Sequence, residues 1–256
     1  MAICRSNTSS KNYDIKSLKP ATQTGANAFI ISTDCHSARF NFTKENIQRV
    51  FPNFFNIYCF KPIQLNDSRI DKSLSLLDKK LASNLISFVT VWTYEITKYS
   101  KHGELEWSFI FEDDVNFVEP SKVSLPNYIN ALQALMYHPE IQFKHGIFYL
   151  GICGPTFASD NHTLIIPFSN NSLLSHKGCG SCVHGMGLTT KRARQLWVEI
   201  SLYCPIPNGP ADIYIHNYCT KNGDYYILGS NLHSPQSSDH YGIAFQDRRR
   251  FSSEIW

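Results

Sequence analysis

The stretch Trp107-Ser-Phe-Ile-Phe-Glu-Asp-Asp-Val115 decides how this chain can fold. Its first five residues are apolar except for one serine, and three carboxylates follow at once. A short apolar run bounded by charge is typical of a strand in the middle of a sheet. Strands that are buried on both faces, as in parallel sheets, lose the alternation of apolar and polar residues. We therefore expect a central strand here that ends in Glu112, Asp113 and Asp114.

The three adjacent carboxylates repel one another, and burying them without a partner would be costly. Glu112 and Asp114 stand two residues apart, which places both on the same side of the strand. Such a pair suits a hard divalent cation that also takes phosphate oxygens and water. The alternative is a strand that stops in a solvated acidic turn.

The composition is that of a globular protein with a sizeable core. The 256 residues suit one large domain or two small ones, and 43% of them are hydrophobic. The formal charge of +3 is small and dispersed, so we expect no nucleic acid as a partner. The cluster Arg248-Arg249-Arg250 could touch phosphate or a membrane, but a solvated tail is the favoured interpretation.

The chain is predicted to consist of a flexible polar leader, residues 1–25, and a single domain, residues 26–256. The leader lacks the apolar core of a secretion signal, and no apolar run reaches the ~18 residues that a membrane span needs. These features predict a cytoplasmic protein. In a chain of this size without a signal, the eight cysteines are expected to be reduced thiols.

The first third of the chain predicts an α/β fold. Residues 28–34 and 54–60 are typical of strands on either side of a helix at 43–50, and this βαβ unit implies a parallel sheet. In open α/β sheets the ligand binds beyond the carboxyl ends of the strands. The candidate residues at that edge are Ser32, Thr33, Asp34 and Arg39, unless they form an ordinary loop.

The rest of the chain is expected to continue this pattern. Helices are predicted at 71–100, 123–137, 189–202 and 211–219, and further strands at 146–151 and 225–228. Residues 152–187 suggest a loose insertion with short antiparallel strands such as 163–168, and residues 229–256 suggest a mostly irregular tail.

Two cysteines in Cys179-Gly-Ser-Cys182, with His184 close behind, raise the question of a metal. A structural zinc site needs four ligands, usually from two such clusters, and no second cluster has a standard spacing. Ordinary thiols are therefore favoured over zinc or a redox pair. The glycines around this motif either let backbone approach a sugar ring or simply form turns. They are Gly178, Gly180, Gly185 and Gly187.

Taken together, several segments resemble glycosyltransferase family 25, the lipopolysaccharide and collagen-type sugar transferases. Phe109–Val115 is similar to the family's strand with its E-D-D-V ending, and this is the most specific match. Ser83–Trp92 resembles the helix written G-C-x-x-S-H-x-x-x-W; it keeps Ser87 and Trp92 but has Phe88 in place of the histidine.

Three further segments carry the resemblance in the same order. Phe148-Tyr-Leu-Gly151 is similar to the following strand, and His184–Thr189 looks like the H-A-Y-A-I-S segment. Pro210-Ala-Asp212 is similar to the P-V-D of collagen-type members, with Ile213 where a second acid would stand.

The resemblance implies a GT-A fold, with a Rossmann-like, mostly parallel central sheet flanked by helices and a small antiparallel insertion. It also implies an inverting glycosyltransferase that uses Mn²⁺ or Mg²⁺. The donor would be a nucleotide-sugar, most simply a UDP-linked galactose, glucose or xylose. The acceptor would be a hydroxyl of an oligosaccharide or glycoconjugate, and the oligomeric state is left open.

Roles for individual residues follow from the same resemblance. The metal ligands would be Glu112, Asp114 and His233, with His240 as the second choice for the last. The base would be Asp212, or alternatively Asp239; Asp212 could instead be a helix N-cap. Donor binding would involve Ser32, Thr33, Asp34, Arg39, Ser87, Asp113 and His184. Asp113 is expected to point away from the metal, toward the donor sugar or a basic residue.

Two other functions stay open. The departures at Phe88 and Ile213 would fit a non-catalytic module that binds a glycan or nucleotide on a degenerate GT-A fold. A nucleotidyltransferase with a similar carboxylate pair is the third reading.

Overall fold

A computed structural model describes residues 25–101, 103–118, 126–158, 163–168, 171–201, 210–223 and 225–251. The predicted leader, apart from Gly25, and most of the proline-rich loop before Pro210 lie outside these ranges. No helix within the described ranges is both long and apolar enough to cross a membrane.

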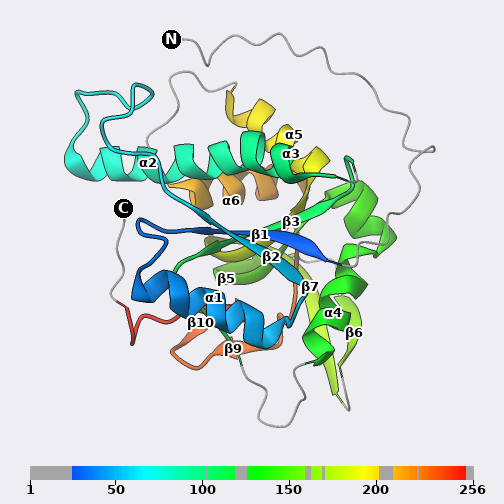
Figure 1. Cartoon of the computed structure of the whole chain (residues 1–256). Helices are drawn as coiled ribbons and strands as arrows, with labels where there is room; N and C mark the ends of the chain where they lie inside the picture. The colour runs from blue at the N-terminus through cyan, green and yellow to red at the C-terminus, as the bar shows by residue number, and fades with distance from the viewer. Residues whose placement is uncertain are drawn as a thin grey trace.

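One large sheet runs through the molecule, with helices on both faces (Figure 1). Its strand order is β2-β1-β3-β7-β8-β5-β10-β9, and β6 pairs with β7. The strands are β1 (Ala26–Ile31), β2 (Phe55–Phe60), β3 (Trp107–Glu112), β5 (Ile147–Phe157), β6 (Thr163–Phe168), β7 (Asn171–Thr189), β8 (Tyr225–Ile227), β9 (His233–Ser234) and β10 (Ser237–Gly242). A second small sheet pairs β4 (Val115–Phe117) with β11 (Ala244–Gln246).

The helices form two layers (Figure 1). One face of the sheet is covered by α1 (Ala38–Val50) and α4 (Pro126–Met136), and the other by α2 (Leu76–Thr90), α3 (Ile96–Tyr99), α5 (Thr190–Ser201) and α6 (Ala211–Asn222). The helix predicted at 71–100 is α2 and α3 joined by the π-helical turn η2 (Val91–Glu95). The helix predicted at 43–50 begins earlier, because Ser37 Oγ caps α1 by accepting a hydrogen bond from Phe40 N.

The prediction of a central strand at 107–112 is confirmed. β3 lies between β1 and β7, and its residues are buried up to Phe111. Trp107, Phe109 and Phe111 pack into the core beneath α1 and α4, whereas Ile110 faces the core beneath α2 and α5. This two-sided burial explains why the strand shows no alternation of polar and apolar residues.

The sheet is mixed, and the prediction of a mostly parallel sheet is wrong. β1 pairs in parallel with β2 and β3, but β3 and β5 both pair antiparallel with β7. Within the segment 152–187, which was predicted to be a loose insertion, the short antiparallel strand expected at 163–168 is confirmed as β6. This segment is the cause of the mixed pairing. It continues β5 and then returns through β6 and β7 as a long antiparallel ribbon.

The glycines of β7 serve packing within this ribbon. A Cβ at Gly187 would lie 2.6 Å from the ring of Phe109, and one at Gly185 would lie 3.0 Å from the ring of Phe111. The aromatic rings of β3 therefore take the space that side chains on β7 would fill. These two glycines lie in a strand and not in a turn.

The C-terminal region is also more regular than predicted. Residues 229–251 form β9, β10 and β11, although we expected an irregular tail. A Cβ at Gly151 would overlap the carbonyl of Ala244, so the glycine lets the backbone of β11 cross directly over β5. Gly242, with a φ of +112°, makes the turn between β10 and β11.

The cysteines correct another prediction. Every cysteine in the described ranges lies in one of three disulfides, Cys35–Cys59, Cys153–Cys182 and Cys179–Cys219. The Cα atoms are 5.7, 5.3 and 5.8 Å apart, as a disulfide requires. The prediction of reduced thiols is wrong for these residues, because the partners meet across the fold and not along the sequence. Disulfides persist in oxidising compartments, so they lend no support to the predicted cytoplasmic location.

Glu140, the first residue of η3 (Glu140–His145), ties this π-helical turn to β7 and β8. Lys177 Nζ donates to Glu140 Oε1 at 2.8 Å, and Tyr226 Oη donates to Oε2 at 2.9 Å. Burial alone would raise the pKa of Glu140, but the hydrogen bonds from Lys177, Tyr226 and His145 outweigh it and lower the pKa to about 2.

Glu140→Gln should lower the free energy of unfolding by about 2 kcal/mol at pH 7. The folded-state pKa lies below the unfolded value of 4.5, so this contribution is complete above pH 4.5 and is lost as the pH falls toward 2. Urea unfolding at pH 7 and pH 2.5 measures the difference in unfolding free energy between the wild type and Glu140→Gln. This difference should shrink by more than half at pH 2.5. Lys144→Met is the control, since Lys144 is exposed and its Nζ lies 3.8 Å from the carboxylate. An equal deficit at both pH values would contradict the assignment.

Candidate metal and nucleotide site

The candidate site lies where β1 and β3 end side by side. The two strands are parallel, with Ile31 opposite Glu112, so the residues that follow each strand meet at one edge. Ser32 Oγ donates a hydrogen bond to Asp113 Oδ2 at 2.6 Å. The disulfide between Cys35 and Cys59 links the loop after β1 to the end of β2.

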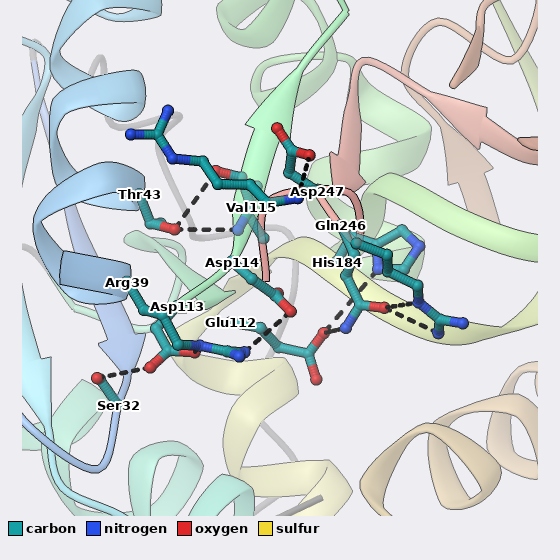
Figure 2. Close-up of polar contacts among 12 residues, drawn as sticks. Ser32, Arg39, Thr43, Glu112, Asp113, Asp114, Val115, His184, Gln246 and Asp247 are labelled. Carbon is teal, nitrogen blue, oxygen red and sulfur yellow. Dashed lines mark hydrogen bonds and ion pairs between the residues drawn. The ribbon is translucent and has the colours of Figure 1, made fainter. Parts of the chain in front are cut away.

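Arg39 of α1 lies between two of the three carboxylates (Figure 2). Its Nε is 3.0 Å from Asp113 Oδ1, and its Nη2 is 3.0 Å from Asp114 Oδ2. Both aspartates are buried, with 1% and 3% of their side chains exposed. Of the two partners predicted for Asp113, the structure places the basic residue there.

Glu112 points away from Arg39, toward β7 and β11 (Figure 2). Gln246 Nε2 donates to Glu112 Oε2 at 2.6 Å, and His184 Nδ1 is 3.9 Å from the same oxygen. The His184 side chain is completely buried. Gln246 Oε1 in turn accepts hydrogen bonds from Arg248, which continues the polar chain outward.

Burial and like charge change the acidity of this cluster. Burial raises the pKa of Glu112 to about 7, and the carboxylates of Asp212 and Asp113 add to it. Burial also raises the pKa of Asp114 to about 7, with a further rise from Glu112 and a partial offset from Arg39. One cation, Arg39, therefore does not balance the charge that the fold gathers here.

Asp212 lies in the first turn of α6, close enough to Glu112 to raise its pKa. It is not the N-cap, which is Pro210, so that alternative for Asp212 is wrong. Its Oδ2 accepts a hydrogen bond from the backbone N–H of Cys182 at 3.0 Å. Cys182 has a positive φ of 56°, and this turn of the β7 backbone aims the N–H at the carboxylate.

An open pocket of about 320 Å³ lies beside Gln246. It is lined by Gln236, Ser237, His240, Gln246, Arg248 and Arg249. Arg248 and Arg249 thus border a hollow surface, and both residues are exposed, so the interpretation of that run as a solvated segment is not contradicted. Guanidinium groups at such a place suit phosphate oxygens.

The other predicted residues make contacts of their own or are exposed. Exposed His233 of β9 contacts the carbonyl of Ser238 and the ring of Tyr241, and Asp239 of β10 is exposed. Thr33 and Asp34 are exposed in the loop after β1. Ser87 is buried in α2, where its Oγ donates to Ser83 O and accepts from Ile63 N; these contacts fix the chain before α2.

Several residues that complete the cluster could not be predicted from the sequence. Gln246 and Asp247 lie in the segment predicted to be irregular, yet Gln246 contacts Glu112 and the Asp247 N–H donates to Asp114 O. Thr43 holds the turn after the carboxylates, because its Oγ1 accepts from Val115 N at 2.9 Å. These contacts span 72 to 134 residues, which local patterns do not encode.

The residues present fit a hard divalent cation. Asp114 Oδ1 is buried and, among the described residues, has no hydrogen-bond partner. This orphaned oxygen and the half-buried Glu112 carboxylate offer the oxygen ligands that Mn²⁺ and Mg²⁺ prefer. Glu112 and Asp114 are the residues that would hold the ion.

Comparison with protein-family models and with curated proteins found no match for this chain. The resemblance to glycosyltransferase family 25 therefore stays a prediction.

Proposed function

We propose that this protein is an inverting, metal-dependent glycosyltransferase that transfers a sugar from a nucleotide-sugar, with UDP as the nucleotide, to a glycan hydroxyl. The observation that carries the proposal is a pair of carboxylates, half-buried Glu112 and buried Asp114, at the carboxyl end of a strand between two α-helical layers. The ordered resemblance to family 25 supports it, and so does the adjacent pocket with Arg248 and Arg249.

The chain's own residues would divide the work. When bound at Glu112 and Asp114, the cation supplies stabilisation of negative charge on the departing diphosphate. Arg39 fixes Asp113 and Asp114 in place. Arg248 and Arg249 face the pocket in which phosphate oxygens would lie.

Asp212 is the proposed general base. In an inverting transfer, the acceptor hydroxyl gives its proton to a carboxylate as its oxygen attacks the sugar from the face opposite the nucleotide. The Asp212 carboxylate is half-buried and close to Glu112, and the hydrogen bond from Cys182 N holds it at the bend of β7. Exposed Asp239 is the competing candidate.

Asp212→Asn should lower kcat for sugar transfer by about 10²- to 10⁴-fold, whereas Asp239→Asn should change it less than twofold. The assay is hydrolysis of UDP-galactose, UDP-glucose and UDP-xylose with Mn²⁺, followed by transfer to glycan acceptors. The opposite ranking of the two variants would move the base to Asp239.

The same assay separates the competing functions. Full turnover in excess chelator would overturn the metal-dependent mechanism. Binding of UDP-sugar without any turnover would favour the non-catalytic binding module, and consumption of a nucleoside triphosphate would favour a nucleotidyltransferase.

A further inference from the structure

Three potential metal ligands converge at the boundary between β5, β7 and β10. Cys153 Sγ lies 3.2 Å from His184 Nε2 and 3.3 Å from His240 Nε2. The ligand atoms all lie within 4.8 Å of one another. Cys153 is directly opposite His240 in the pairing of β5 with β10, so rigid strands hold the three side chains together.

The two histidines are placed as ligands rather than as surface groups. His184 is completely buried, and the Nδ1 atoms of both His184 and His240 lack a hydrogen-bond partner among the described residues. Their Nε2 atoms both face the same sulfur.

Cys153 forms a disulfide with Cys182, so the Cys182 sulfur lies within bonding distance of the Cys153 sulfur. We propose that reduction of the Cys153–Cys182 disulfide converts this cluster into a zinc site held by the thiolates of Cys153 and Cys182 and the imidazoles of His184 and His240. This inference does not depend on the proposed sugar transfer.

The donor set selects the metal. Two thiolates and two imidazoles are a common tetrahedral combination for structural Zn²⁺. With zinc–sulfur and zinc–nitrogen bonds of ordinary length, sulfur and nitrogen would lie roughly 3.6 Å apart. The 3.2 and 3.3 Å separations seen here need only a small expansion. Mn²⁺ prefers oxygen ligands, so the Glu112–Asp114 pair would take a different ion.

The reaction balances with a thiol as the reductant. Two molecules of a small thiol reduce the disulfide to two cysteine thiols and are oxidised to one disulfide of their own. Binding of Zn²⁺ then releases the two thiol protons to solvent and leaves a site without net charge. Cys182 is the more exposed of the two sulfur-bearing residues, and the pocket lined by His240 offers a path for the ion.

The zinc site would be joined to the carboxylate cluster through His184, whose ring lies between the two. His184 Nδ1 is 3.9 Å from Glu112 Oε2. Metal-bound histidines commonly donate their second N–H to a carboxylate, which orients the ring. Glu112 is placed to accept that bond after a small movement.

The test uses Co²⁺ as a spectroscopic substitute for zinc in the full chain, after treatment with a thiol and under anaerobic conditions. We expect one tetrahedral Co²⁺ per chain, with a thiolate-to-cobalt charge-transfer band and the visible bands of tetrahedral cobalt, both removed by Zn²⁺. The oxidised protein should show neither band. Cys153→Ser and His240→Gln should weaken binding by at least tenfold.

Cys35→Ser is the matched control, because it removes a disulfide from the loop after β1 and should leave the cobalt bands unchanged. His240→Gln keeps the Cys153–Cys182 bond, so its folding is verified by circular dichroism in the oxidised state. The proposal is overturned if the reduced protein gives no charge-transfer band, or if its only visible bands are those of octahedral cobalt. It is also overturned if a folded His240→Gln binds Co²⁺ as tightly as the wild type, or if Cys35→Ser abolishes binding.

Discussion

Glu112→Gln should make the protein more stable and, in the same step, abolish metal-dependent sugar transfer. The Glu112 carboxylate is held close to Asp212 and Asp113, and burial raises its pKa from 4.5 to about 7. A shift of that size costs about 2 to 3 kcal/mol of stability at pH 8, where the group is ionised. Glutamine removes the charge and can still accept the hydrogen bond from Gln246 through its carbonyl.

The measurement is thermal and urea unfolding at pH 8, with and without Mn²⁺, alongside donor hydrolysis. Without metal the variant should be more stable than the wild type by about 2 kcal/mol. Mn²⁺ should stabilise the wild type and leave the variant unchanged, because binding to the folded state shifts unfolding only where a site exists. If Glu112→Gln is less stable than the wild type and keeps its sugar-transfer activity, Glu112 is not part of the metal site.

Glu106→Gln is the matched control for this experiment. Glu106 is buried as well, but its carboxylate accepts hydrogen bonds from Ser100 Oγ and the N–H of Lys101 in the turn before β3. Removing that charge should cost about 1 to 2 kcal/mol and leave turnover intact. A gain of stability in Glu112→Gln and a loss in Glu106→Gln would show that the Glu112 charge is kept for ligand binding, whereas the Glu106 charge stabilises the fold.

Arg39→Met should be the most destabilising single change at the site, at about 3 to 5 kcal/mol. Methionine retains the apolar length of the side chain but leaves the buried Asp113 and Asp114 without their cation. The pKa values of both aspartates are already raised by burial, and without Arg39 they should rise further. Stability should therefore fall as the pH rises above about 4, and the loss should be larger at pH 8 than at pH 5.

A double variant tests whether charge is the cause. Arg39→Met with Asp113→Asn should recover part of the lost stability, because it removes one of the two uncompensated carboxylates. Urea unfolding at pH 5 and pH 8 on both variants provides the measurement. A deficit that is independent of pH, and is not relieved by Asp113→Asn, would mean that Arg39 contributes through packing, for example against the ring of Phe251.

Local pattern was enough to predict the elements that carry the carboxylates. The apolar run of β3 and the βαβ unit before it are confirmed. They could be predicted because strands buried on both faces and helices with one apolar face produce recognisable patterns in short stretches of sequence. Asp113 was expected to meet the donor sugar or a basic residue, and it meets Arg39. The candidate loop after β1 was placed by the general rule for parallel strands.

The errors share a physical cause. The glycines of β7 were predicted either to let backbone approach a sugar ring or to form turns, yet Phe109 and Phe111 fill the space above Gly187 and Gly185. The three disulfides and the Cys153–His184–His240 cluster join residues that lie 24 to 87 positions apart. Such pairings depend on register between strands, which the spacing of cysteines in the sequence does not record.

The crossing of β11 over β5 at Gly151 also determines when the site can exist. Gln246 and Asp247 are synthesised more than 200 residues after Arg39. Contacts between such distant segments form late in folding, since long loops must close first. A nascent chain that has not yet reached Ala244 can pair β1, β2 and β3, but its carboxylates lack the amide that faces Glu112. The protein should therefore acquire its ligand-binding capacity only after Gln246 and Asp247 have been synthesised.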